Sequence, residues 1–126
     1  RLTVVQVPSG LTVIDDTFNA NPTSAAVALQ TLIDLPVGGR RVVITPGLVE
    51  LGERQAAENQ ALGAHVRAAE CELIIVADTN YAALRKGFGP GAHHVAIRED
   101  AVTWVRENLG GDDAVLYLND LPDHYP

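Results

Sequence analysis

The densest group of polar side chains lies in residues 14–22, which have the sequence IDDTFNANP. Two adjacent carboxylates, Asp15 and Asp16, precede Asn19 and Asn21, and Pro22 then opens a stretch of helical character. A carboxylate can accept hydrogen bonds from ribose hydroxyls or help to hold a metal ion, and an asparagine amide both donates and accepts. Free backbone amides at a helix N-terminus can also face an anion. The segment therefore indicates a binding site, although turn formation and helix capping are the alternative explanation, above all for Asn21.

The elements that must position these side chains follow from the apolar pattern. Two runs over residues 2–7 and 11–14 flank Pro8-Ser9-Gly10, which is typical of an antiparallel hairpin. Helical and strand-like stretches then alternate, and the strand-like runs lack strict apolar–polar alternation, as strands covered on both faces should. We expect helices that begin at Pro22 and stop before Pro36, and then over residues 55–69, 81–88 and 99–109, with strands over 41–45, 73–77, 94–97 and 114–118.

This order predicts an α/β fold: a three-layer, Rossmann-like sandwich on a mostly parallel sheet with an N-terminal antiparallel hairpin, all in a single domain over residues 1–126. Ligands of such sheets gather at the carboxyl ends of the strands. That rule selects loops 15–21, 46–53 and 119–126, with residues 78–80 as a fourth candidate. The three main loops are also the most polar stretches of the chain, so we expect the functional site there.

Charge and composition narrow the class of protein. The net charge is −7, and the nine lysines and arginines are scattered, so the chain lacks the basic face that nucleic acid or an anionic membrane requires. No apolar run approaches the ~20 residues that cross a bilayer. The single cysteine, Cys71, cannot form an internal disulfide, which fits a cytoplasmic protein. We expect Cys71 to lie in or near the hydrophobic core. The start without methionine in strand-like sequence suggests an excised domain.

Histidine spacing gives no sign of a metal centre. His65, His93 and His94 have no partners at the spacing of metal ligands, so we predict no metal held by this chain alone.

Two motifs carry a family resemblance. Residues 15–22, DDTFNANP, resemble the D-D-[ST]-[YF]-N-A-N-P stretch that opens the C-terminal domain of Mur ligases, and residues 48–53, LVELGE, resemble that family's M-L-E-L-G-E. The order of elements is similar from end to end. Within the family, the similarity is greatest to the ligases that join D-alanyl-D-alanine to a UDP-muramoyl tripeptide.

The resemblance implies an ATP-dependent ligase of peptidoglycan (cell-wall) precursor synthesis, in which a UDP-substrate domain and a P-loop ATPase domain precede this one. The expected partners are those upstream domains, ATP, a UDP-muramoyl-peptide acceptor and an amine donor, and Mg²⁺ would be bound mainly by the P-loop domain. The same resemblance implies that the nucleotide is bound by Asp16, Asn19 and Asn21. It also implies that the substrates are bound by Asp15, Thr17, Glu50, Asn119 and Asp120.

The chain also departs from that pattern. It contains no G-x-x-x-x-G-K-[ST] segment, so we predict that the isolated chain turns over no ATP. The family's G-D-M before L-E-L-G-E is replaced by Pro46-Gly47-Leu48, and its K-G-S-R after the last strand is absent. Without that lysine and arginine a dipeptide carboxylate lacks its usual partners, so another amine donor is an alternative. A second alternative is a non-catalytic module that docks a protein partner through its acidic loops.

Overall fold

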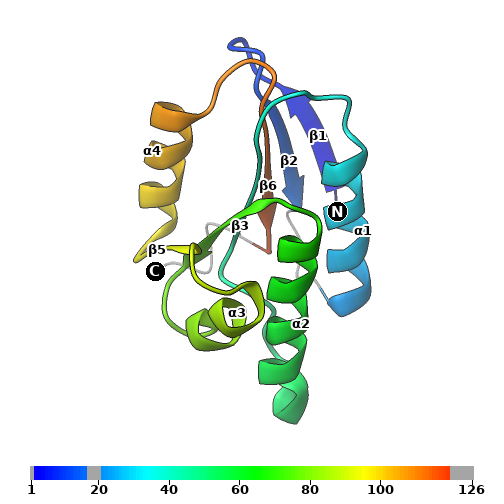
Figure 1. Ribbon diagram of the computed structural model, residues 1–126, viewed down its shortest axis with the longest axis vertical. Helices are drawn as coiled ribbons and strands as arrows, with labels where there is room; N and C mark the ends of the chain where they lie inside the picture. Colours follow the sequence, from blue (N-terminus) through cyan, green and yellow to red (C-terminus); the bar gives the residue numbers. More distant parts are fainter. Residues whose placement is uncertain (1, 17–20, 120–126) are drawn as a thin grey trace.

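A computed structural model describes residues 2–16 and 21–119 of the chain. Within that part, six strands form one sheet in the order β1-β2-β6-β3-β4-β5 (Figure 1). The elements are β1 Leu2–Gln6, β2 Thr12–Asp16, α1 Pro22–Asp34, β3 Arg41–Thr45, the 3-10 turn η1 Gly52–Arg54, α2 Gln55–Ala68, β4 Glu72–Val76, α3 Tyr81–Phe88, β5 His93–Val95, α4 Arg98–Asn108 and β6 Ala114–Leu118.

The pairing of the strands confirms the predicted topology. β1 and β2 form the antiparallel hairpin, and its turn contains Gly10 at φ 97°, a left-handed conformation that glycine adopts without strain. All other neighbours are parallel, and β6, the last strand of the chain, lies between β2 and β3. The carboxyl ends of β2, β6, β3 and β4 therefore lie side by side.

Helices cover the sheet on both faces, as Figure 1 shows, with α4 on one side and α1 and α2 on the other. One core cluster joins the sheet to α1, α2 and α3 and includes Ile14, Leu32, Leu62 and Leu84. A second cluster joins the opposite face to α4 and includes Ile44, Val105 and Tyr117. Burial from both sides explains why the central strands lack alternation. The three-layer prediction is confirmed.

Some boundaries differ from the prediction. We expected the first functional loop to begin at Asp15, but β2 continues through Asp16 because both residues pair with β6 as well as with β1. The expected strand over residues 94–97 is a three-residue edge strand, and α4 begins earlier than predicted, at Arg98. No helix in the described ranges, 2–16 and 21–119, is long and apolar enough to cross a membrane.

Candidate functional site

The loops predicted to carry function follow β2, β6, β3 and β4, which are neighbours in the sheet. The described parts of these loops therefore lie at one edge of the sheet. Contacts between them are direct: the side-chain amide of Asn119, after β6, donates to the carbonyl of Gly47, after β3, at 2.9 Å. The Asn80 amide, ahead of α3, donates to the Pro46 carbonyl at 3.0 Å. The loops after β3, β4 and β6 are therefore held together as one surface.

The two adjacent aspartates do not act as a pair. Successive strand residues point to opposite faces, so Asp16 lies on the face of Ile14 and α1, whereas Asp15 lies on the face of Tyr117 and α4. Asp16 is 5% exposed and Asp15 is half-buried. The two adjacent carboxylates of the polar segment therefore lie on opposite sides of the sheet.

Asp16 and Asn21 are brought together. Both line an open hollow of about 660 Å³ between the edge strand β1 and the first turns of α1. The other lining residues are neutral: Leu2, Thr23, Ser24, Val27 and Ala28. A hollow with one carboxylate and several hydroxyl or amide groups suits a ligand that carries hydroxyl groups, such as a ribose. Among the residues that the structure describes, none that lines this hollow is cationic.

Asn21 already has a structural role. Its Oδ1 accepts from the backbone amide of Ser24 at 2.8 Å, and the Ser24 hydroxyl accepts from the backbone amide of Asn21 at 2.9 Å. This capping box starts α1, with Pro22 in its first turn. The cap uses Oδ1, so a ligand contact from this side chain would come from its Nδ2 group.

The loop after β3 is fixed by a residue that the sequence analysis missed. Asn59, on α2, is fully buried. Its Oδ1 accepts from the backbone amide of Leu48 at 2.8 Å, and its Nδ2 donates to the carbonyls of Leu48 and Gln55, both at 2.9 Å. The signal was present in the sequence, because Asn59 lies on the same helical face as Leu62 and Val66, where an apolar residue is expected.

Besides Asp15, two predicted substrate residues lie within the described part of the chain. Glu50 is exposed at this edge and has φ 61°, which is uncommon for a residue with a side chain. Asn119 is fully buried and bonded to Gly47, which shows a structural contact; its predicted contact with substrate stays a prediction. Thr17, Asn19 and Asp120 lie outside the described residues.

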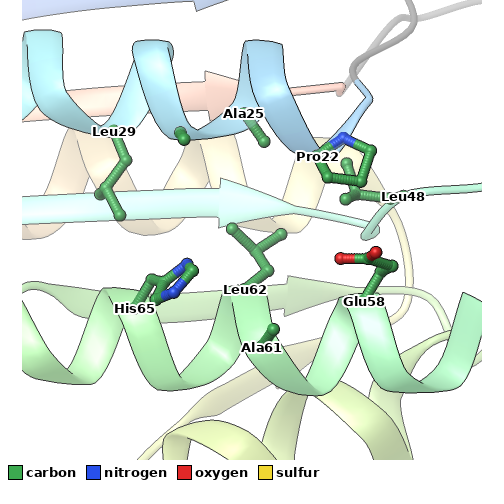
Figure 2. A pocket seen from close by; sticks show the side chains of 9 residues that line it. Pro22, Ala25, Leu29, Leu48, Glu58, Ala61, Leu62 and His65 are labelled. Carbon is green, nitrogen blue, oxygen red and sulfur yellow. The ribbon is translucent and has the colours of Figure 1, made fainter.

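A groove adjoins the site between α1 and α2. Figure 2 shows Pro22, Leu48 and Glu58 at the end nearer the functional edge, with Leu62 and Ala25 in the middle. Its empty volume is about 300 Å³, and its lining is mainly apolar. His65 lies farther along it (Figure 2). The groove was not predicted, because it depends on how far two helices stand apart.

The remaining candidate groups take part in packing rather than in the site. Cys71 is buried, as predicted, and desolvation raises the pKa of its thiol, with Arg41 opposing the shift. His94 stacks on Tyr81 at 4.0 Å, and its Nε2 lies 3.0 Å from Asp78 Oδ1. Across residues 2–16 and 21–119, no group of three or more histidine, cysteine, aspartate or glutamate side chains could hold a metal ion.

Fold and site together define a class of protein: an α/β domain with a mostly parallel sheet that presents a carboxylate and shaped loops at the carboxyl ends of its strands. The chain belongs to the family described as Mur ligase, glutamate ligase domain, whose model matches residues 1–118.

Comparisons with individual proteins agree with that membership. The chain is 31% identical to the UDP-N-acetylmuramoyl-tripeptide–D-alanyl-D-alanine ligase of Mycobacterium leprae, over 92% of this chain and 26% of that protein. The ligase of the same name from Bacillus subtilis is 25% identical, over 93% of this chain and 27% of its own length. The chain therefore spans about a quarter of the length of these curated relatives.

Solved structures support the fold. The MurF ligase of Thermotoga maritima in complex with ADP superposes with a TM-score of 0.76 at 18% identity, over 91% of this chain and 26% of that one. A MurF structure from Acinetobacter baumannii gives a TM-score of 0.75 at 23% identity, over 94% of this chain and 26% of that one. The Rossmann-like prediction is thus confirmed.

Proposed function

We propose that this chain is the C-terminal domain of an ATP-dependent amide-bond ligase of peptidoglycan precursor synthesis. In this proposal a UDP-substrate domain and a P-loop ATPase domain precede it in a longer cytoplasmic protein, and it closes over ATP and positions the incoming amine. The match to the Mur ligase family over residues 1–118 carries the proposal. The names of the matched relatives are those of ligases, and no observation favours the alternative of a non-catalytic docking module.

The chemistry proposed for the whole enzyme has two steps. A carboxylate oxygen of the acceptor attacks the γ-phosphorus of ATP, the bond from that phosphorus to the bridging oxygen breaks, ADP leaves with the electron pair, and the carboxylate becomes an acyl phosphate. The nitrogen of the amine donor then attacks the carbonyl carbon; the C–N bond forms, the C–O bond to phosphate breaks, and phosphate leaves with the electron pair while the amine loses a proton. An acyl phosphate is open to hydrolysis, so a domain that closes over it protects the intermediate from water.

The hollow beside β1 is proposed as the nucleotide side of this closure. Asp16 would accept hydrogen bonds from the ribose hydroxyls, with Asn19 and Asn21 nearby. Among the described residues, a lining of one carboxylate and otherwise neutral groups supports a role toward the sugar rather than the phosphates. Positive charge for the phosphates, including Mg²⁺, would come mainly from the P-loop domain, since phosphoryl transfer requires it.

The amine donor is proposed to lie against the loops after β3 and β6. Glu50 and Asp15 supply negative charge there, and Thr17, Asn119 and Asp120 complete the proposed substrate side. D-Alanyl-D-alanine is the first donor to test, because the matched relatives are named for it. Other amine donors should also be tested, because the sequence after β6 lacks the family's lysine and arginine.

An amine screen on the longer protein tests the proposal. ATP hydrolysis would be measured with a UDP-muramoyl tripeptide and, in turn, D-alanyl-D-alanine, single amino acids and ammonia. We expect hydrolysis that depends on both acceptor and one class of amine. Hydrolysis that no amine stimulates would contradict the proposal.

A further inference from the structure

Three buried asparagines hold the turn formed by residues 46–48, and we call Asn59, Asn80 and Asn119 the asparagine brace. They come from α2, from the residue ahead of α3 and from the residue after β6, and they are 0%, 4% and 0% exposed. Each donates at least one hydrogen bond to a carbonyl of the turn. Because buried polar groups are costly to leave unpaired, the turn cannot shift without disturbing three elements at once.

The turn and the brace are also in close packing contact. Gly47 has φ 92°, and a Cβ atom added there would lie 2.5 Å from Asn59 Oδ1 and 2.8 Å from Asn80 Nδ2. The backbone amide of Gly47 donates to the Thr45 hydroxyl at 2.9 Å. Surface loops are usually more mobile than the elements that they connect. This turn is instead fixed on all sides.

Glu50 lies two residues after the fixed turn. Its left-handed φ of 61° is a conformation that persists only where the surroundings enforce it. Two more non-glycine residues of this kind lie at the same edge, Ala77 at 64° directly after β4 and Asn119 at 55° directly after β6, whereas Glu70 and Asp112 lie at the amino ends of β4 and β6. At a functional site, such a conformation sets a group in place before a ligand arrives.

We propose that Asn59 and Asn80 are positioning residues for the amine donor: through the turn of residues 46–48, they place the Glu50 carboxylate to receive the ammonium group of the donor. Neither asparagine touches the reacting atoms. A carboxylate held in advance attracts a cation without reorganising, and small displacements of positioned groups reduce rates strongly. The inference rests on the proposed ligase function.

The test uses Asn59→Asp in the longer ligase. Aspartate has the same shape but cannot donate to the carbonyls of Leu48 and Gln55. We expect KM for the amine donor to rise about tenfold or more, with KM for ATP unchanged within about twofold. The matched control is Asn108→Asp, which removes a similar bond to the carbonyl four residues earlier, that of Trp104, at the opposite end of the sheet. It should leave both constants unchanged.

A second pair of variants separates positioning from simple stabilisation. Glu50→Gln should raise the same KM, and adding Asn59→Asp to it should change that KM little further, because both variants remove one interaction. If Asn59→Asp lowers the melting temperature but leaves the donor KM at its original value, the inference is wrong.

Two further outcomes are distinguishable. Should Asn59→Asp fail to fold, Thr45→Val removes only the bond to the Gly47 amide; a smaller rise in the donor KM supports the inference, and an unchanged KM overturns it. A wild-type protein without amine-dependent ATP hydrolysis overturns the proposed function and this inference with it. An active wild type whose variants keep their KM overturns this inference alone.

Discussion

Gly87 on α3 packs directly against the carbonyl of Gln60 on α2, with no room for a side chain between the two helices. A Cβ atom at Gly87 would also lie 2.9 Å from the backbone nitrogen of Ala64. Gly63, on α2, faces the backbone of α3 in the same way. These glycines allow α2 and α3 to approach closely, and α3 directly follows the Asn80 segment of the functional edge.

Gly87→Ala should therefore destabilise the fold. Inserting a methyl group into closely packed backbone costs about 1–3 kcal/mol, and we expect the upper part of that range. The free energy of unfolding from urea titration is the measurement. Gly110→Ala is the matched control, because a Cβ atom there meets nothing within 4 Å, and it should change the stability by less than about 0.5 kcal/mol. Equal effects of the two substitutions would show that the helix contact is not tight.

A second prediction concerns Arg40 and Glu72, which form a bidentate pair at 2.8 Å across the amino ends of β3 and β4. The hydrogen bonds from Arg40 lower the pKa of Glu72 below its ordinary value of 4.5. A carboxyl whose pKa is lower in the folded state than in the unfolded state stabilises the fold. This stabilisation is complete at pH values above the ordinary pKa and is lost as the pH falls through the folded-state pKa. Because both side chains are more than a third exposed, the pair is worth at most about 1 kcal/mol.

Glu72→Gln should thus cost up to about 1 kcal/mol at pH 7 and progressively less as the pH falls below 4.5. Unfolding titrations across that pH range provide the measurement. Adding Arg40→Ala to Glu72→Gln should lower the free energy of unfolding further only through the loss of the other contacts of Arg40, because the ion pair is already gone. A stability difference that does not depend on pH would rule out the ion pair as its cause.

Asn21 offers a test that separates capping from ligand binding. Asn21→Ala removes the bond to the Ser24 amide and should lower the free energy of unfolding by about 1 kcal/mol. Asn21→Ser should retain the cap and most of that stability. If Nδ2 also contacts the nucleotide, Asn21→Ser in the longer protein should bind ADP more weakly in spite of its stability. Wild-type affinity in the serine variant would leave Asn21 with the capping role alone.

The general fold was predictable because its main determinants are local. Apolar runs such as residues 73–76, the Pro8-Ser9-Gly10 turn and the Asn21-Pro22 helix start each specify one element, and alternating strands and helices have few ways to pack. The rule that ligands gather at the carboxyl ends of parallel strands then selected loops that follow neighbouring strands of the sheet.

Details of the site depended on contacts between distant residues. Asp15 and Asp16 are strand residues because β6 pairs beside them, and β6 begins almost a hundred residues later, at Ala114. The role of Asn59 required knowing that α2 packs over the turn after β3. Local patterns contain neither fact, so the sequence did not show that the two adjacent carboxylates lie on opposite faces of the sheet.

The central claim is that this domain completes a nucleotide pocket, and ADP affinity tests it most directly. Titration calorimetry would compare the longer protein, its Asp16→Ala variant and residues 1–126 alone. A buried carboxylate that accepts hydrogen bonds from a ligand contributes about 1.5–3 kcal/mol, so the variant should bind ADP roughly tenfold to a hundredfold more weakly, and the isolated chain should show no binding. Equal affinity in the wild type and in Asp16→Ala, with Asp34→Ala as an exposed carboxylate control, would contradict the account.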